Sequence, residues 1–233
     1  MKCPAIVLAA GLVVMASTTS YAQVTLSGSV ETVSQYVWRG YALVEGTSMQ
    51  PALDVAWEDK GLSLSLWASV ALIHRDRHRT LDEVDLTVNY ALASGSWGSV
   101  DVGFIIYSFP NQDQFSFKDH TSPEAYITVA PNVPLSPEVF LAYDANLGDD
   151  LYASLGVGHA LSVAGQPFEL GVTAGYNNGQ FEADDGFSHL DLSVSTDLEL
   201  GPVNLAPRAV YVHSFENTLN EGNRVFFGVG LGW

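Results

Sequence analysis

The sequence predicts an all-β protein: a transmembrane antiparallel β-barrel of about twelve strands, of the kind found in bacterial outer membranes. Apolar and polar residues alternate along most of the 233-residue chain, in runs of about ten residues. No run beyond the N-terminal region holds the roughly 18 apolar residues that a transmembrane helix needs. Residues 224–233 alternate up to the terminal Trp233, as expected of a strand that closes a barrel.

The composition excludes one class of partner and constrains the fold. The chain has 26 acidic and 9 basic side chains, a formal charge of −17, and 47% hydrophobic residues. A surface that binds nucleic acid needs clustered Lys and Arg, so nucleic acid is excluded as a partner. So high a hydrophobic fraction is unusual in so acidic a chain, and it indicates that apolar and charged residues lie on separate faces.

The first 22 residues have the three-part pattern of a secretory signal peptide. Lys2 precedes an apolar stretch at 5–16, and small residues end at Ala22, which predicts cleavage before Gln23. Cleavage would remove Cys3, the single cysteine, so no disulfide is expected in the mature barrel of residues 23–233. A lipoprotein is disfavoured because the apolar stretch follows Cys3 instead of preceding it.

The first half of the chain gives five predicted strands. In residues 24–38 apolar side chains alternate with polar ones such as Glu31, and Arg39 follows on the polar side. The tight turn Asp59-Lys60-Gly61 separates the next two runs. The alternation places these two strands at 50–58 and 62–72, and two more at 84–90 and 100–107.

The second half alternates less regularly and gives seven further strands. Two of them, at 151–158 and 168–176, follow each other as a pair in which apolar side chains alternate with glycines and polar residues. The other five strands are expected at 124–129, 139–144, 188–198, 203–215 and 224–233. The total is even, as single-chain outer-membrane barrels of bacteria require.

The connections differ in length at the two ends of the predicted barrel. Short segments rich in Gly and Pro lie at 59–61, 92–97, 131–136, 162–167 and 199–202. The longest and most polar connections belong to the other set, at 41–47, 74–80, 108–121, 145–150, 177–186 and 216–223. Outer-membrane barrels have short periplasmic turns and longer outer loops, which predicts a periplasmic N-terminus.

A soluble exported β-sandwich is the alternative fold. Such domains also show alternation, but their strands usually have about five or six residues, and several runs here are about twice that length. The alternation up to the chain end also favours the barrel.

Four segments resemble the TorF family of proteobacterial proteins, a conserved hypothetical family classed as porins by analogy. They are SQYVWRG (34–40), PALDVAWEDKGLSLSLWAS (51–69), DEVDLTVNYA (82–91) and DVGFIIYSFP (101–110). The sequence departs from the family pattern at Asn89, where the family has Gly. The resemblance implies a small outer-membrane barrel, but it does not indicate which solute the barrel would transport.

The polar faces supply the candidate pore lining, and their acidic excess favours hydrated cations over anions. Two structural readings stand beside this one: the charges could pair and close the barrel, or Trp67 could brace the wall instead of stacking on a solute. Arg39 could equally anchor loop carbonyls or contact a solute. The pore-lining candidates are Glu31, Arg39, Asp54, Trp67, Asp85, Asp101, Glu124, Asp144, Asp191, Arg208 and Arg224.

Aromatic residues near strand ends are expected to form the two girdles that anchor a barrel at the membrane interfaces. Tyr36, Trp38, Tyr143 and Tyr176 are assigned to the outer girdle, and Trp57, Tyr90, Phe168 and Trp233 to the inner one.

An enzyme is disfavoured, and no catalytic residue, metal ligand or cofactor is assigned. His213-Ser214 are adjacent and face opposite sides of a strand, while His189 and Asp191 share a face as polar lumen residues do by chance. The basic loop 74–79 could bind lipopolysaccharide phosphates or a metal, although a solvated loop is favoured. The acidic pairs at 149–150 and 184–185 could bridge to lipid phosphate through divalent ions.

The predicted function is passive diffusion of small hydrophilic solutes across the outer membrane of a Gram-negative bacterium. A substrate-specific channel, a closed structural barrel and an outer-membrane enzyme are the alternatives. The expected partners are outer-membrane lipid, lipopolysaccharide, small solutes and, through the C-terminal strand, the barrel assembly machinery.

Overall fold

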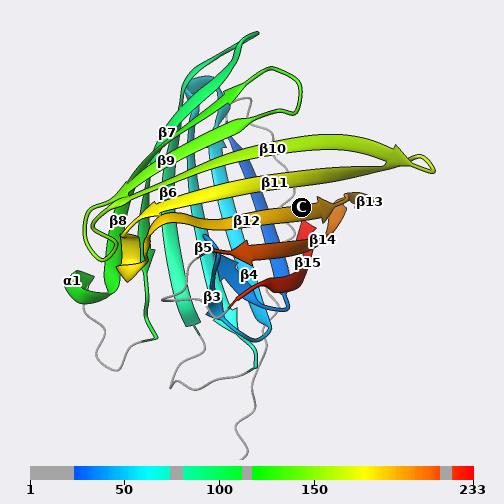
Figure 1. Ribbon diagram of the computed structural model, residues 1–233. Helices are drawn as coiled ribbons and strands as arrows, with labels where there is room; N and C mark the ends of the chain where they lie inside the picture. The colour runs from blue at the N-terminus through cyan, green and yellow to red at the C-terminus, as the bar shows by residue number, and fades with distance from the viewer. Residues whose placement is uncertain (1–23, 74–80, 112–116, 216–221) are drawn as a thin grey trace, which may run out of the picture.

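The computed structural model describes residues 24–73, 81–111, 117–215 and 222–233. Twelve antiparallel strands form a closed barrel, which confirms the predicted fold (Figure 1). The predicted signal peptide, residues 1–22, and the basic loop at 74–79 lie outside the described residues. The barrel strands are β1 (Thr25–Val33), β4 (Ser48–Trp57), β5 (Leu62–Ala71), β6 (Leu81–Gly95), β7 (Gly98–Ser108), β8 (Thr121–Pro131), β9 (Glu138–Asp144), β10 (Leu151–Val163), β11 (Gln166–Asn178), β12 (Asp185–Ser195), β14 (Val203–Ser214) and β15 (Arg224–Gly232).

The barrel closes between its first and last strands. Ser29 of β1 is opposite Gly232 of β15, and Gly28 and Trp233 exchange backbone hydrogen bonds of 3.0 and 3.2 Å. Each of the other barrel strands pairs with its neighbours in chain order, and the short β13 (Leu198–Leu200) only extends the edge of β14 at one end. Closure leaves the barrel strands without an open sheet edge. An open edge would leave backbone N–H and C=O groups without hydrogen bonds in a hydrocarbon environment.

The two faces of the wall differ as the alternation predicts. Leu53, Leu66 and Leu86 are in register across β4, β5 and β6 and are 43–48% exposed on the outer face. The neighbouring row of Asp54, Ser65 and Thr87 points inward. The wall is therefore apolar outside and polar inside.

The two ends of the barrel carry different connections. The turn end has the short segments 58–61, which include η1 (Glu58–Lys60), 96–97, 132–137, 164–165 and 196–202. The loop end has the segments 34–47, 72–80, 109–120, 145–150, 179–184 and 215–223, which include α1 (Phe117–His120) and η2 (Gln180–Glu182). Within the described residues, no helix is both long and apolar enough to span a bilayer.

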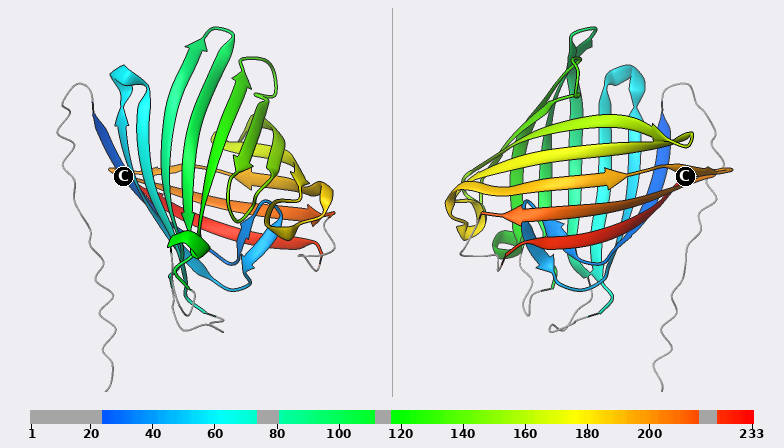
Figure 2. Two further views of the ribbon diagram at one scale, coloured as in Figure 1. Left: turned by 90° about the vertical axis from the view of Figure 1, so that its left-hand side faces the viewer. Right: turned by 45° about the vertical axis from the view of Figure 1, so that its right-hand side comes forward.

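The predicted first strand, 24–38, is wrong in its last third. β1 ends at Val33, the chain bends at Ser34–Gln35, and β2 (Tyr36–Trp38) and β3 (Tyr41–Val44) form a separate two-stranded sheet. Arg39 and Gly40 join them with φ values of 47° and 88°, as in the tight hairpin turns whose twist matches antiparallel strands. This β2–β3 hairpin lies on the inner side of the barrel strands at the loop end (Figure 2).

Candidate functional site

The β2–β3 hairpin crosses the lumen and is the centre of the candidate site. Its side chains meet residues from strands all around the barrel. Tyr36 packs against Trp67 and donates a hydrogen bond to Glu83, Trp38 packs against Tyr107, Val37 packs against the cluster of Val210, Val212 and Phe226, and Asn177 donates a hydrogen bond to the Tyr41 hydroxyl. The structure therefore places a constriction where an open tube was expected.

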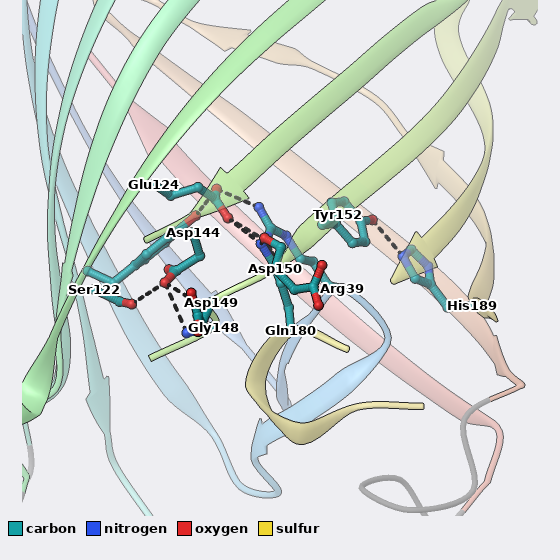
Figure 3. A network of polar contacts seen from close by, with 11 residues as sticks. Arg39, Ser122, Glu124, Asp144, Gly148, Asp149, Asp150, Tyr152, Gln180 and His189 are labelled. Atoms are coloured by element: carbon teal, nitrogen blue, oxygen red, sulfur yellow. Dashed lines mark hydrogen bonds and ion pairs between the residues drawn. The ribbon is translucent and has the colours of Figure 1, made fainter. Parts of the chain in front are cut away.

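Arg39, at the tip of the hairpin, is bound to the opposite wall (Figure 3). Its Nη1 and Nη2 donate to Glu124 Oε2 and Oε1 at 2.7 and 2.6 Å, and Nη1 also donates to Gln180 Oε1 at 2.6 Å. Glu124 additionally accepts a hydrogen bond from the Tyr107 hydroxyl. Two parallel hydrogen bonds between a guanidinium and a carboxylate fix the orientation of the side chains as well as pairing their charges. We call Glu124 of β8, together with Gln180, the seat of the hairpin tip.

Burial of this ion pair is nearly complete. The side chain of Arg39 is 7% exposed and that of Glu124 is 0% exposed. The guanidinium carbon lies 4.1 Å from the ring centre of Tyr152 and 4.3 Å from that of Trp38, so aromatic rings cover the cation. Burial alone would lower the pKa of Arg39, but the hydrogen bonds and charge of Glu124 outweigh it and raise the pKa.

Two loops at the loop end complete the seat. Gln180 is fully buried, accepts from Arg39 and donates through Nε2 to the carbonyl oxygen of Asp150 at 2.8 Å. Asp144 organises the 145–150 loop: its Oδ1 accepts the Ser122 hydroxyl at 2.6 Å and the backbone N–H groups of Asn146 and Gly148, both at 2.9 Å. Asp144, a predicted pore-lining residue, is thus buried in a loop network.

His189 and Asp191 are in direct contact, and Tyr152 extends the row. His189 Nδ1 lies 2.8 Å from Asp191 Oδ1, and His189 Nε2 lies 2.9 Å from the Tyr152 hydroxyl. The rings of Tyr152 and His189 are nearly parallel, and Arg39 lies over the same tyrosine. Asp191, His189 and Tyr152 thus form one hydrogen-bonded row, and this row lies beside Arg39 at the tip of the hairpin.

The wall under the other flank of the hairpin is built differently. Glu83 and Ser69 are opposite each other on β6 and β5, and Asp85 is opposite Trp67. Glu83 accepts the Tyr36 hydroxyl at 2.9 Å. Neither Glu83 nor Asp85 has a cationic partner among the ion pairs of the described residues.

The other predicted pore-lining charges lie apart from the Arg39–Glu124 pair, with Arg224 at the loop end of β15 and Asp54 and Asp101 toward the turn end of β4 and β7. Glu31 and Arg208 form a two-bonded pair of 2.5 and 3.0 Å, and Arg224 pairs with Glu45 at 3.3 Å. Asp101 accepts a hydrogen bond from Asn89, the residue at which the sequence departs from the TorF pattern. Asp54, in the inward row beside Ser65, is not in an ion pair of the described residues. That these residues line a path for solutes remains a prediction.

Two assignments to the membrane girdle are wrong. Tyr36 is 7% exposed and, with Trp38, belongs to the β2–β3 hairpin inside the barrel. The bend at Ser34–Gln35 causes the error, because it turns inward the residues that a continuous strand would direct outward. The other six candidates lie on the outer face, and their role as a girdle stays a prediction: Trp57, Tyr90, Tyr143, Phe168, Tyr176 and Trp233.

Several residues of the site were missed by sequence reasoning. Tyr107, Tyr152 and Gln180 gave no local signal, because their partners are distant in the sequence. The Arg39-Gly40 dipeptide between two short apolar runs is the one feature that could have indicated a tight hairpin. No group of three or more His, Cys, Asp or Glu placed to hold a metal occurs among the residues that the structure describes.

Comparisons with known proteins place the fold. The model of one protein family, described as "Bacterial protein of unknown function (Gcw_chp)", matches residues 17–220. No curated protein matches the sequence. A solved structure described as a KdgM porin superposes with a TM-score of 0.56 at 12% identity, covering 89% of this chain and 98% of that one.

Two further solved structures are similar. A NanC porin structure has a TM-score of 0.51 at 11% identity and covers 90% of this chain and 99% of its own. LpxR from Salmonella typhimurium has a TM-score of 0.52 at 11% identity, with 89% and 99% covered. At such low identities the likeness establishes a shared barrel fold.

Proposed function

The chain belongs to the Gcw_chp family of bacterial proteins of unknown function, and we propose that it is a small outer-membrane channel through which hydrophilic solutes diffuse, cations preferentially. The similarity to the KdgM and NanC porins supports a small outer-membrane channel. The resemblance to the TorF family supports the same reading. We propose no enzymatic activity for it.

The charge balance of the lumen carries the proposed selectivity. Arg39, Arg208 and Arg224 each have a carboxylate partner, so none adds a net positive charge to its surroundings. Asp54 and Asp101 have no cationic partner among the described ion pairs. An interior with uncompensated carboxylates attracts hydrated cations and repels anions.

The surroundings of the barrel follow from the same proposal. Residues 1–22 would direct export and be removed, and the C-terminal strand would engage the barrel assembly machinery. The exposed leucines of the outer face would then contact outer-membrane lipid, with lipopolysaccharide in the outer leaflet.

Reversal potentials in planar bilayers test this function. With a potassium chloride gradient at about 0.1 M, the purified barrel should prefer cations, and the preference should weaken near 1 M because the Debye length falls from about 10 Å to about 3 Å. Asp54→Asn should reduce the preference more than Asp59→Asn, which removes an exposed carboxylate from a turn outside the lumen. Anion preference, or equal effects of the two variants, would contradict the proposed selectivity.

A substrate-specific channel is the second candidate, and an aromatic row on one inner wall favours it. Tyr126, Phe140 and Tyr152 follow one another across β8, β9 and β10 with ring centres 5.5 and 6.2 Å apart. Tyr152 is buried beneath Arg39, but Tyr126 and Phe140 are half-buried and offer stacking faces to ring-shaped solutes. Block of the ion current by a sugar at millimolar concentration, relieved by Phe140→Ala, would support this candidate.

A further inference from the structure

The β2–β3 hairpin is held in the lumen without a strand ladder to the wall. β2 and β3 pair with each other in their own two-stranded sheet, apart from the barrel sheet. Its two roots are fixed: Ser34 N–H donates to the carbonyl oxygen of Phe227 at 2.8 Å, and Leu72 N–H donates to that of Thr47 at 2.8 Å. A hairpin fixed at both roots can move as a unit without breaking barrel pairing.

The flank of the hairpin around Arg39 is well bonded, and in the loop network beside it one buried side-chain atom, Asp144 Oδ2, lacks a partner among the described residues. Around Arg39, the two carboxylate oxygens of Glu124 and the amide oxygen of Gln180 accept hydrogen bonds from the guanidinium N–H groups. Gln180 Nε2 and Tyr107 also have hydrogen-bond partners. This flank is the seat that holds the hairpin across the lumen.

The opposite flank covers polar groups that have no partner. Tyr36 lies against Trp67 and Glu83, over the wall formed by β4, β5 and β6. In this region the polar atoms Ser48 Oγ, Gln50 Nε2, Ser69 Oγ, Asp85 Oδ1 and Gln35 Oε1 are buried without a hydrogen-bond partner in the described structure. Ser48 and Ser69 are 0% exposed and Gln50 is 6% exposed.

These groups make the seated position unfavourable on one side. A buried polar group without a hydrogen bond loses its hydration and gains nothing in return. Displacement of the hairpin from the β4–β6 wall would return water to all of them, while the seated position is held by the Arg39–Glu124 pair. A position stabilised on one flank and destabilised on the other can have a second position of similar free energy, and two positions of similar free energy are what a two-state element requires.

We propose that the β2–β3 hairpin is a gate, closed in this structure, which opens by moving away from the β4–β6 wall about its roots at Ser34 and Thr47. The opened passage would run along that wall toward Asp54 on the inner face of β4, and would therefore admit cations first. The inference rests on the proposed channel function.

A reversible crosslink tests the gate. Val37 of the hairpin packs against the cluster that contains Val212 of β14, so Val37→Cys with Val212→Cys, in a chain also carrying Cys3→Ser, should form a disulfide on oxidation. In planar bilayers, oxidation should lower the open probability at least tenfold, and dithiothreitol should restore it. Val37→Cys alone, treated identically, should be unaffected. Equal opening in the oxidised and reduced protein would overturn the gate.

Two further variants keep the test decisive if the cysteine pair does not assemble. Arg39→Ala removes the seat and should raise the open probability several-fold; unchanged opening would overturn the proposal. A chain in which a Gly-Ser linker replaces residues 35–46 should conduct continuously. If this chain conducts and the unaltered protein never opens, the hairpin is a permanent plug and the gate is wrong. If even this chain does not conduct, the channel function itself fails.

Discussion

Arg39 and Glu124 are separated by 85 residues in the sequence and joined by two N–H···O bonds of 2.6 and 2.7 Å in the structure. One partner is at the tip of an inward-folded hairpin and the other is on the barrel wall. The pair thus connects the element that constricts the lumen to the wall that surrounds it.

Removing one partner of this buried pair should be costly. Glu124→Ala leaves the Arg39 guanidinium buried without a counter-charge, and we expect a loss of about 3–5 kcal/mol in the free energy of unfolding. Glu31→Ala is the matched control, since Glu31 and Arg208 form a similar two-bonded pair with side chains 25% and 37% exposed. Its loss should be at most about 1 kcal/mol. Urea unfolding in detergent micelles measures both, and equal losses would refute the role given to burial.

The hairpin turn provides a second comparison. Gly40 has φ 88°, and a β-carbon there would lie 2.7 Å from the β-carbon of His189; Gly201 has φ 69° and no atom within 4 Å of such a carbon. Gly201→Ala should therefore cost only the conformational strain of a left-handed residue, about 1–2 kcal/mol. Gly40→Ala should cost more and shift the hairpin tip. Protease cleavage at Arg39, followed by mass spectrometry, should increase for Gly40→Ala and remain low for Gly201→Ala.

Neighbouring residues on β5 distinguish the lipid face from the lumen. Leu66 is 48% exposed on the outer face, and Leu66→Arg should destabilise the membrane-inserted barrel by about 2–4 kcal/mol. Ser65 faces inward opposite Asp54, so Ser65→Arg should assemble and change mainly the conductance. Heat-modified migration on gels reports assembly. Normal assembly of Leu66→Arg together with failure of Ser65→Arg would mean that the faces are reversed.

Thiol labelling on intact cells tests the orientation. Ala145 is exposed at the loop end and Val133 is 51% exposed at the turn end. With Cys3 removed together with the signal peptide, Ala145→Cys should react with an impermeant maleimide on whole cells. Val133→Cys should react only after the cells are broken. The reverse pattern would place the loops in the periplasm.

The strands of the barrel were predictable because their signal is local. Alternation such as that of Leu53, Asp54 and Val55 follows from the pleat of a single strand and needs no knowledge of neighbours. Closure follows from the need to pair every backbone group in hydrocarbon. These two arguments give twelve strands and an apolar outer face, as the structure has them.

The hairpin was not predictable by the same reasoning. Tyr36 and Trp38 continue the alternation of β1, so the pattern gives no sign of the bend at Ser34–Gln35. The inward position is decided by partners such as Glu83, Glu124 and Asn177, which lie far along the chain. A pattern read within a window of ten or so residues cannot weigh contacts of that range.

The position of the hairpin in the chain also orders its assembly. The hairpin directly follows the first strand in the sequence. Its root at Ser34 is nevertheless fixed by the last strand, because the Phe227 N–H, 193 residues later, donates a hydrogen bond to Ser34 Oγ. Its tip is fixed by the hydrogen bond from Arg39 to Gln180, which lies 141 residues later in the sequence. Contacts of such sequence separation form late in folding, because the intervening chain must be ordered first. The nascent barrel should therefore pass through a wide, unobstructed intermediate, and the constriction should form only as the seam between β1 and β15 closes.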